Sequence, residues 1–163
     1  MICSMSFAQD KFTYDIKGLT DYVVKDNTMS APDMYKKAIN WIKENYVNPI
    51  EVIKMTIENE KIRYEGMEKN FNCYSSVCAD ATYMIEITFK DGKYKFDPIS
   101  LKMSVASGKS FEVPLSDFSI YYDKKGELRK TGDKSLDKFS ELFNSLSQRL
   151  DDYINDRVKK SDW

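Results

Sequence analysis

Histidine is absent from the chain, and this absence limits the chemistry that its other side chains support. Without imidazole there is no Ser-His-Asp triad, no Cys-His nucleophile pair and no histidine-ligated metal site, so most hydrolase mechanisms are excluded. An enzyme built from this sequence would have to rely on carboxylates and on the 11 tyrosines. Most of the tyrosines fall on predicted core faces.

Two short motifs are similar to reactive sites but lack the necessary surroundings. The segment Ser107-Gly108-Lys109-Ser110 matches the end of a phosphate-binding P-loop, yet the first glycine of that motif would fall at Met103, in a predicted strand. Asp151, Asp152 and Asp156 are close together on the polar side of a predicted helix, where a solvated run of charges is expected. Neither motif predicts an active site.

The cysteine pattern bears on the cellular compartment. Cys73 and Cys78 lie in one predicted loop, 70–80, at a spacing that closes a small ring in an oxidising compartment. We predict a disulfide between them, with two reduced thiols as the alternative. The spacing differs from the Cys-x-x-Cys pairs of zinc sites, so we expect no metal and no cofactor.

The first residues are similar to the end of a secretory signal. Ser6 and Ala8 occupy the −3 and −1 positions of a cut before Gln9, although a basic region and most of an apolar region are missing. A frayed cytosolic terminus is the alternative. We expect residues 1–9 to be a signal remnant or a disordered start of an exported protein.

The length of the chain predicts one domain, and its overall charge names no partner. The 163 residues suffice for a single domain, which we place at 10–163. The 25 lysines and arginines balance 26 acidic residues, so no overall field directs the chain to nucleic acid or to an anionic membrane. No apolar run approaches the roughly 18 residues of a transmembrane helix. We expect a monomer or a weak dimer that does not bind nucleic acid.

The clearest structural pattern is a β-hairpin at residues 81–105. Apolar residues alternate on both sides of Asp91-Gly92, which predicts two long strands with one buried face and a type I′ turn that sets Lys90 opposite Lys93. In the second strand the apolar residues fall at even positions before Asp97-Pro98 and at odd positions after it. This change predicts a bulge there, with Ile85 opposite Ile99, that bends the strands and makes one face concave.

A second hairpin is predicted at residues 51–58 and 61–67, around Asn59-Glu60. A two-residue turn would place Ile57 opposite Ile62 on an apolar face and Thr56 opposite Arg63 on a charged face. The apolar set of both hairpins comprises Ile53, Met55, Ile57, Tyr83, Ile85, Ile87 and Phe89. We expect both helices of the protein to cover this face.

Helices and connections complete the expected architecture. Ser30 is the predicted N-cap of a helix that ends at Asn48-Pro49, and a second, longer helix is predicted at about 135–159. Residues 10–25 favour strand in two pieces. Residues 104–133 are expected to be an irregular stretch that packs through its aromatic side chains.

Four features of the sequence support a resemblance to a known family. They are the element order β-α-β-β-β-β-α, a tryptophan-bearing helix over 36–42, the segment Ile62-x-Tyr-x-Gly66 and the segment around Lys90-Asp-Gly-Lys-Tyr94. On these segments the chain resembles a family of bacterial, mostly exported domains of unknown function with a TBP-like fold. The resemblance covers about 12–105, and it implies export to the periplasm or cell surface of a Gram-negative bacterium. It implies a two-layer α+β fold with a curved antiparallel sheet, TBP-like or helix-grip-like, and it supplies no catalytic residues. The insertion 107–132 is longer than that fold requires.

The face opposite the helices is the predicted site of partner binding. Its charged residues balance in sign, unlike the basic sheet of the fold's DNA-binding namesake. The face comprises Lys54, Thr56, Arg63, Glu65, Thr82, Met84, Glu86, Thr88 and Lys95, and the ligand- or partner-binding candidates among them are Lys54, Arg63, Met84, Glu86 and Lys95.

We therefore expect a non-catalytic exported module that binds a protein, glycan or lipid through this face. One alternative is a small secreted enzyme that uses carboxylates and tyrosines. A second is a carrier of hydrophobic ligands, in a groove between the sheet and the C-terminal helix.

Overall fold

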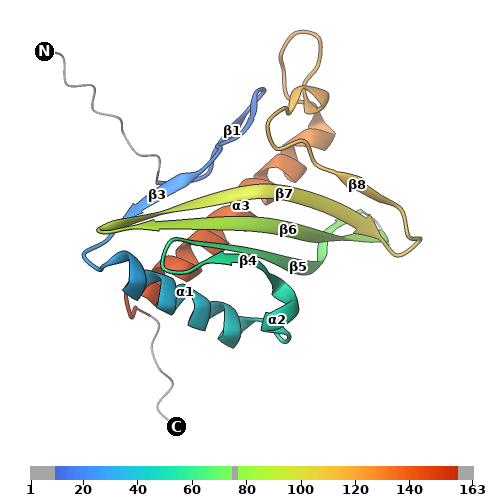
Figure 1. Ribbon diagram of the computed structural model, residues 1–163. Coiled ribbons are helices and arrows are strands. Elements are labelled where there is room, and N and C mark those ends of the chain that lie inside the picture. The colour runs from blue at the N-terminus through green and yellow to red at the C-terminus, as the bar shows by residue number, and fades with distance from the viewer. Residues whose placement is uncertain (1–9, 75–76, 158–163) are drawn as a thin grey trace, which may run out of the picture.

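The structure of the chain, a computed structural model, describes residues 10–74 and 77–157 (Figure 1). In chain order the elements are β1 (Tyr14–Asp15), β2 (Gly18–Leu19), β3 (Val23–Asp26), α1 (Ala31–Asn45), α2 (Pro49–Val52), β4 (Ile53–Ile57), β5 (Lys61–Tyr74), β6 (Val77–Lys90), β7 (Lys93–Val105), β8 (Ser110–Glu112), the short helix η1 (Ser119–Tyr121) and α3 (Lys130–Ile154). The predicted signal remnant lies outside the described residues, whereas α3 ends at Ile154, about five residues before its predicted end near Lys159.

The main sheet has six strands, each antiparallel to its neighbours. Five follow the order β3-β7-β6-β5-β4, and β8 pairs with the second half of β7, while β1 and β2 form a separate pair. The buried residues of α1 and α3 share one core cluster with Tyr83, Ile85 and Ile87 of β6. Both helices therefore cover one face of the sheet, and the predicted two-layer α+β fold is confirmed.

The register of the central hairpin agrees with the prediction, but its turn does not. Lys90 pairs with Lys93 and Phe89 pairs with Tyr94. Of the two turn residues, only Gly92 has a left-handed backbone, with φ 78°. A type I′ turn needs a positive φ at both residues, so this turn is not type I′. The Asp91 side chain accepts a hydrogen bond from the Ala31 N–H at the start of α1, and these tertiary contacts determine the turn.

The bulge of β7 lies one or two residues beyond its predicted place. Ile85 pairs with Pro98 and Met84 pairs with Ser100, so the unpaired residue is Ile99, whose side chain is exposed. Pro98 is buried and occupies the core-facing position that we had given to Ile99. A proline ring is apolar enough to continue the buried face, which is why the apolar pattern mispositioned the bulge.

The predicted register of the second hairpin is wrong. Ile57 pairs with Lys61 and Thr56 with Ile62, because the turn contains three residues and Asn59 adopts a left-handed φ of 61°. Shifting one strand by one residue moves its side chains to the other face. Met55 and Ile57 therefore lie on the face opposite Ile85, and Thr56 lies on the helix side.

The predicted loop at 70–80 is largely strand. β5 extends to Tyr74 and β6 begins at Val77, with Cys73 paired directly with Cys78. The register shifts between Glu68 and Asn72, where Asn70 has a φ of 52°. The long β5–β6 ladder positions the side chains of the open face.

α1 begins at the predicted cap. The Ser30 hydroxyl accepts a hydrogen bond from the Asp33 N–H and donates one to the Asp33 carboxylate, and Pro32 sits in the first turn, where no N–H donor is needed. The buried residues of the helix are Met34, Ala38, Trp41 and Ile42.

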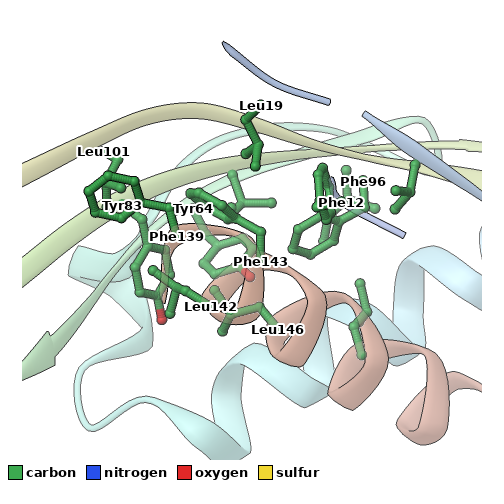
Figure 2. Close-up of a cluster of buried hydrophobic side chains, with 14 of the residues drawn as sticks. Phe12, Leu19, Tyr64, Tyr83, Phe96, Leu101, Phe139, Leu142, Phe143 and Leu146 are labelled. Carbon is green, nitrogen blue, oxygen red and sulfur yellow. The ribbon is translucent and has the colours of Figure 1, made fainter. Parts of the chain in front are cut away.

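α3 starts about five residues earlier than predicted, at Lys130. Its buried stripe packs under the sheet (Figure 2) and comprises Leu136, Phe139, Leu142, Phe143, Leu146, Leu150 and Ile154. Phe12, on the chain before β1, packs between Phe96 of the sheet and Phe143 of α3. No helix in the described part of the chain is long and apolar enough to cross a membrane.

The long strands bend toward the helices (Figures 1 and 2). The concave face of the sheet is consequently the one that holds the core, and the face turned away from the helices is not hollowed by this bend. The stretch between β7 and α3 contains regular structure, since β8 pairs with β7, and its Phe118 side chain is fully buried. As expected, this stretch packs against the domain.

Candidate functional site

The open face of the sheet is the face turned away from α1 and α3. Cross-strand neighbours form rows on it: Arg63, Glu86 and Asp97 make one row, and Lys61, Thr88, Lys95 and Val24 make the next. The alternation of strand residues places these side chains opposite the core. Strand alternation places four of the five candidate residues on this face. The fifth, Lys54, lies at the register shift of β4 and reaches the face through an ion pair with Glu65 at 3.1 Å.

Glu86 is the centre of this face and is nearly buried, with a side-chain exposure of 8%. Its two carboxylate oxygens accept from the Lys61 ammonium at 2.8 Å and from the Arg63 guanidinium at 2.6 Å. Burial raises the pKa of the Glu86 carboxyl, but hydrogen bonds and charges from Lys61 and Arg63 outweigh this effect and lower the pKa below its ordinary value. Glu86 therefore positions the two cations and offers little surface to a partner.

The other candidates divide into paired and apolar residues. Lys95 forms an ion pair with Asp97 at 2.8 Å and lies over the Tyr22 ring at 5.0 Å. Met84 is half-buried between Glu65 and Ser100 on the neighbouring strands. The prediction for Thr56 is wrong, because it lies on the helix side. Met55 and Ile57 are on the open face instead.

A hollow of about 440 Å³ lies at the end of the open face near the Asp91-Gly92 turn. We call it the basic hollow, because its lining includes Lys61, Lys90, Lys93 and Lys95, with Tyr22 and Val24 on the β3 side. Only Lys95 was a candidate from the sequence. For Lys90 and Lys93 the sequence did contain a signal, because their predicted pairing puts two like charges side by side on the solvent face.

The acidic residues near the C-terminus have structural partners. The buried Tyr94 hydroxyl donates to an Asp151 oxygen at 2.9 Å, and Arg157 pairs with both Asp151 and Asp152. Lys37 of α1 bonds Asp156 at 2.6 Å. The expectation of a fully solvated charge run is wrong for Asp151, whose contacts join the end of α3 to β7.

A cluster of tyrosines occupies the core beneath the C-terminal end of α1. The Tyr46 and Tyr83 hydroxyls are 3.0 Å apart, and the ring of Tyr64 packs edge-on against Tyr46 and Trp41. Burial raises the pKa of all three phenols above the ordinary 10. These tyrosines consequently remain protonated at neutral pH.

The cysteine pair lies at the opposite end of the sheet from the basic hollow. Cys73 and Cys78 are bonded to each other in the structure and join the ends of β5 and β6. In the described residues there is no group of three or more histidine, cysteine, aspartate or glutamate side chains arranged to hold a metal ion.

Two solved structures share the fold. A DUF4468 family protein from Bacteroides ovatus is 13% identical over 100% of both chains, with a TM-score of 0.67. A TBP-like protein from Parabacteroides distasonis is 13% identical over 82% of this chain and 92% of its own, with a TM-score of 0.57. No family model matches the sequence, and no curated protein is significantly similar to it. The predicted TBP-like fold is confirmed, and at this identity the similarity concerns the fold alone.

Proposed function

We propose that the protein is a non-catalytic, exported module that binds an anionic ligand on the open face of its sheet. An antiparallel sheet commonly leaves one face to water, so exposure by itself carries no argument. The observation that supports the proposal is the ion-paired centre around Glu86.

The ion pairs of Glu86 outweigh the cost of burying its carboxylate, but well-packed apolar residues often replace a buried ion pair without loss of stability, so stability alone does not require one on a solvent face. Here the buried carboxylate fixes Lys61 and Arg63, whose side chains are 27% and 38% exposed. Donors that are fixed before binding lose less conformational entropy when a ligand arrives. The open face thus presents pre-positioned cations to an anion.

The chemistry of the remaining groups supports a non-catalytic role. The buried tyrosines have raised pKa values, so they are poor bases at neutral pH. The Asp151 carboxylate is already engaged by Tyr94 and Arg157. We find no observation that favours the alternative of an enzyme using carboxylates and tyrosines.

The alternative of a hydrophobic-ligand carrier has less support than the open face. The region between the sheet and α3 is filled by core side chains (Figure 2). Phe96 and Phe143 are 0% exposed and Phe139 is 2% exposed. A lipid chain would have to displace several of these side chains.

The binding proposal is tested by affinity electrophoresis of the folded protein in gels that contain dextran sulfate, polygalacturonate or neutral dextran. We expect retardation by the anionic polymers only. Arg63→Gln should weaken the retardation by about twofold or more, because it removes a charge-assisted donor. Lys43 is exposed on α1, on the other side of the molecule. The control variant Lys43→Gln removes one charge there and should leave the retardation unchanged.

Equal retardation by neutral dextran, or equal loss in both variants, would overturn the binding proposal. Export is tested separately by fractionating the native bacterium. We expect the chain outside the cytoplasm, beginning at Gln9, and recovery of uncut chain in the cytosol would overturn this part of the proposal.

A further inference from the structure

Lys90 and Lys93 are an unfavourable pair for stability. They are direct cross-strand partners at the end of the β6–β7 hairpin, where like charges repel, and Asp26 of β3 is the other cross-strand neighbour of Lys93. In the part of the chain that the structure describes, no carboxylate lies within 4.0 Å of either ammonium group, whereas Lys61 and Lys95 each have an acidic partner. Two neighbouring cations therefore remain available to a ligand.

The backbone that carries these lysines is held firmly. Besides the contact between Asp91 and the Ala31 N–H at 2.8 Å, the Gly92 N–H donates to the Met29 carbonyl at 3.0 Å, and the Gly92 carbonyl accepts from the Asn27 N–H at 2.8 Å. The turn is thereby joined to the connection between β3 and α1. Lys90 and Lys93 cannot separate by opening the hairpin without breaking these bonds.

The opposite wall of the basic hollow has a different character. Tyr22, with an exposure of 47%, presents an aromatic ring, and Val24 adds an apolar surface beside it. Tyrosine rings commonly pack against flat apolar faces, while their hydroxyl groups stay in water. The hollow therefore combines a cationic end with a partly apolar wall.

We infer that the basic hollow binds a phosphate or sulfate ester carried on a sugar-sized ring. The terminal oxygens of the ester accept from Lys90 and Lys93, with Lys61 and Lys95 nearby, and the ring lies against Tyr22. A tetrahedral ester offers three terminal oxygens to several ammonium donors at once, which suits this cluster better than a carboxylate. The inference rests on the proposed function, and it specifies the ligand chemistry and the place on the open face.

The test is isothermal titration calorimetry of the full chain with glucose 6-phosphate, glucose 6-sulfate, glucose and inorganic phosphate. We expect saturable binding of at least one ester, weaker binding of inorganic phosphate and no binding of glucose. The two ester arms distinguish phosphate from sulfate as the preferred group. Binding of both esters no tighter than inorganic phosphate would indicate an adventitious ion only and would overturn the inference.

Two matched double variants locate the site. K90Q/K93Q should weaken ester binding by about tenfold or more, because two charge-assisted contacts are lost. Its melting temperature should change little, because the variant removes both the repulsion between the two lysines and the cross-strand attraction of Lys93 to Asp26. K69Q/K102Q removes the same charge from exposed positions in the half of the sheet far from the basic hollow and should change ester affinity by less than about twofold.

Equal losses in the two double variants would show general attraction to positive charge and would overturn the inference. So would unchanged ester binding by a folded K90Q/K93Q variant. If that result accompanied loss of polymer binding in Arg63→Gln, the proposed function would stand and only this placement of the ligand would fail.

Discussion

At the centre of the open face, Glu86 connects the stability of the sheet with the positions of its cations. Its carboxylate accepts from Lys61 and Arg63, and its pKa is lowered from the ordinary value of 4.5. A lowered pKa means that the folded state holds the charged form more tightly than the unfolded state does. The stabilisation is therefore present above about pH 4.5 and is lost as the pH falls through the folded-state pKa.

Glu86→Gln removes this contribution. We expect a loss of about 1 kcal/mol at pH 7, a modest figure because both cations are partly exposed to water. Urea denaturation at several pH values measures the difference between the two proteins, which should be constant from pH 6 to 8 and shrink below about pH 4.5. A difference that does not shrink on acidification would contradict this role.

The role of Glu86 was only partly accessible from the sequence. Strand alternation placed both Arg63 and Glu86 on a solvent face, but their contact requires the register between β5 and β6. That register depends on the irregularity between Glu68 and Asn72, which no turn motif marks. The burial of the Glu86 carboxylate follows from this long-range pairing.

At the scale of elements, local turns determined what could be predicted. The Asp91-Gly92 hairpin has a two-residue turn, and its predicted register is correct except at the bulge, where Ile85 pairs with Pro98 and not with Ile99. The Asn59 turn holds three residues, with Asn59 in the left-handed region, and the difference of one residue reversed the faces of residues 55–57, whereas Ile53 stays on the predicted core side because the register shifts again before Met55. The bulge at Ile99 was misplaced because Pro98 serves as a core residue.

The β5–β6 pair leads to a prediction at Gly66. A Cβ atom there would lie 2.5 Å from the Tyr83 ring, which stands directly across from it. Gly66→Ala should therefore destabilise the protein by about 1–3 kcal/mol in urea denaturation. In a Tyr83→Ala background the same change should cost much less. Equal costs in both backgrounds would show that the Tyr83 ring is not the obstacle.

The far end of the same pair carries the Cys73–Cys78 disulfide. We expect labelling of unreduced, denatured native protein to find neither cysteine reactive with thiol reagents. The C73S/C78S variant should lose about 2 kcal/mol at most, because the bond closes only a short loop. Labelling of both cysteines would contradict the bond, and it would weaken the case for export.

On the scale of the whole molecule, all large helices lie on one side of the sheet. The sequence predicted this arrangement because the apolar faces of the central hairpin and of both helices require a common core. It did not predict the direction of the bend. The sheet curves around the helices (Figure 1), and core side chains fill the resulting concave face (Figure 2). The open face is therefore shaped by its side chains and not by the bend.

The arrangement places the core residues and the proposed binding residues on opposite faces of the sheet. Core residues on one face hold α1 and α3, while substitutions on the open face leave that core intact. Effects on ligand binding and on folding should accordingly be separable, except at the ion-paired Glu86. The basic hollow was not recognised from the sequence because it joins residues of β3, β5, β6 and β7, whose order in the sheet follows from tertiary pairing.

The most direct test of the account is amide NMR of the ¹⁵N-labelled full chain during titration with a sulfated or phosphorylated sugar. We expect the largest shift changes at Lys61, Thr88, Lys90, Lys93 and Lys95, together with Tyr22 and Val24. The amides of α1 and α3 should change little. Changes concentrated around Trp41 and Arg149, between the two helices, or no saturable change at all, would contradict binding on the open face.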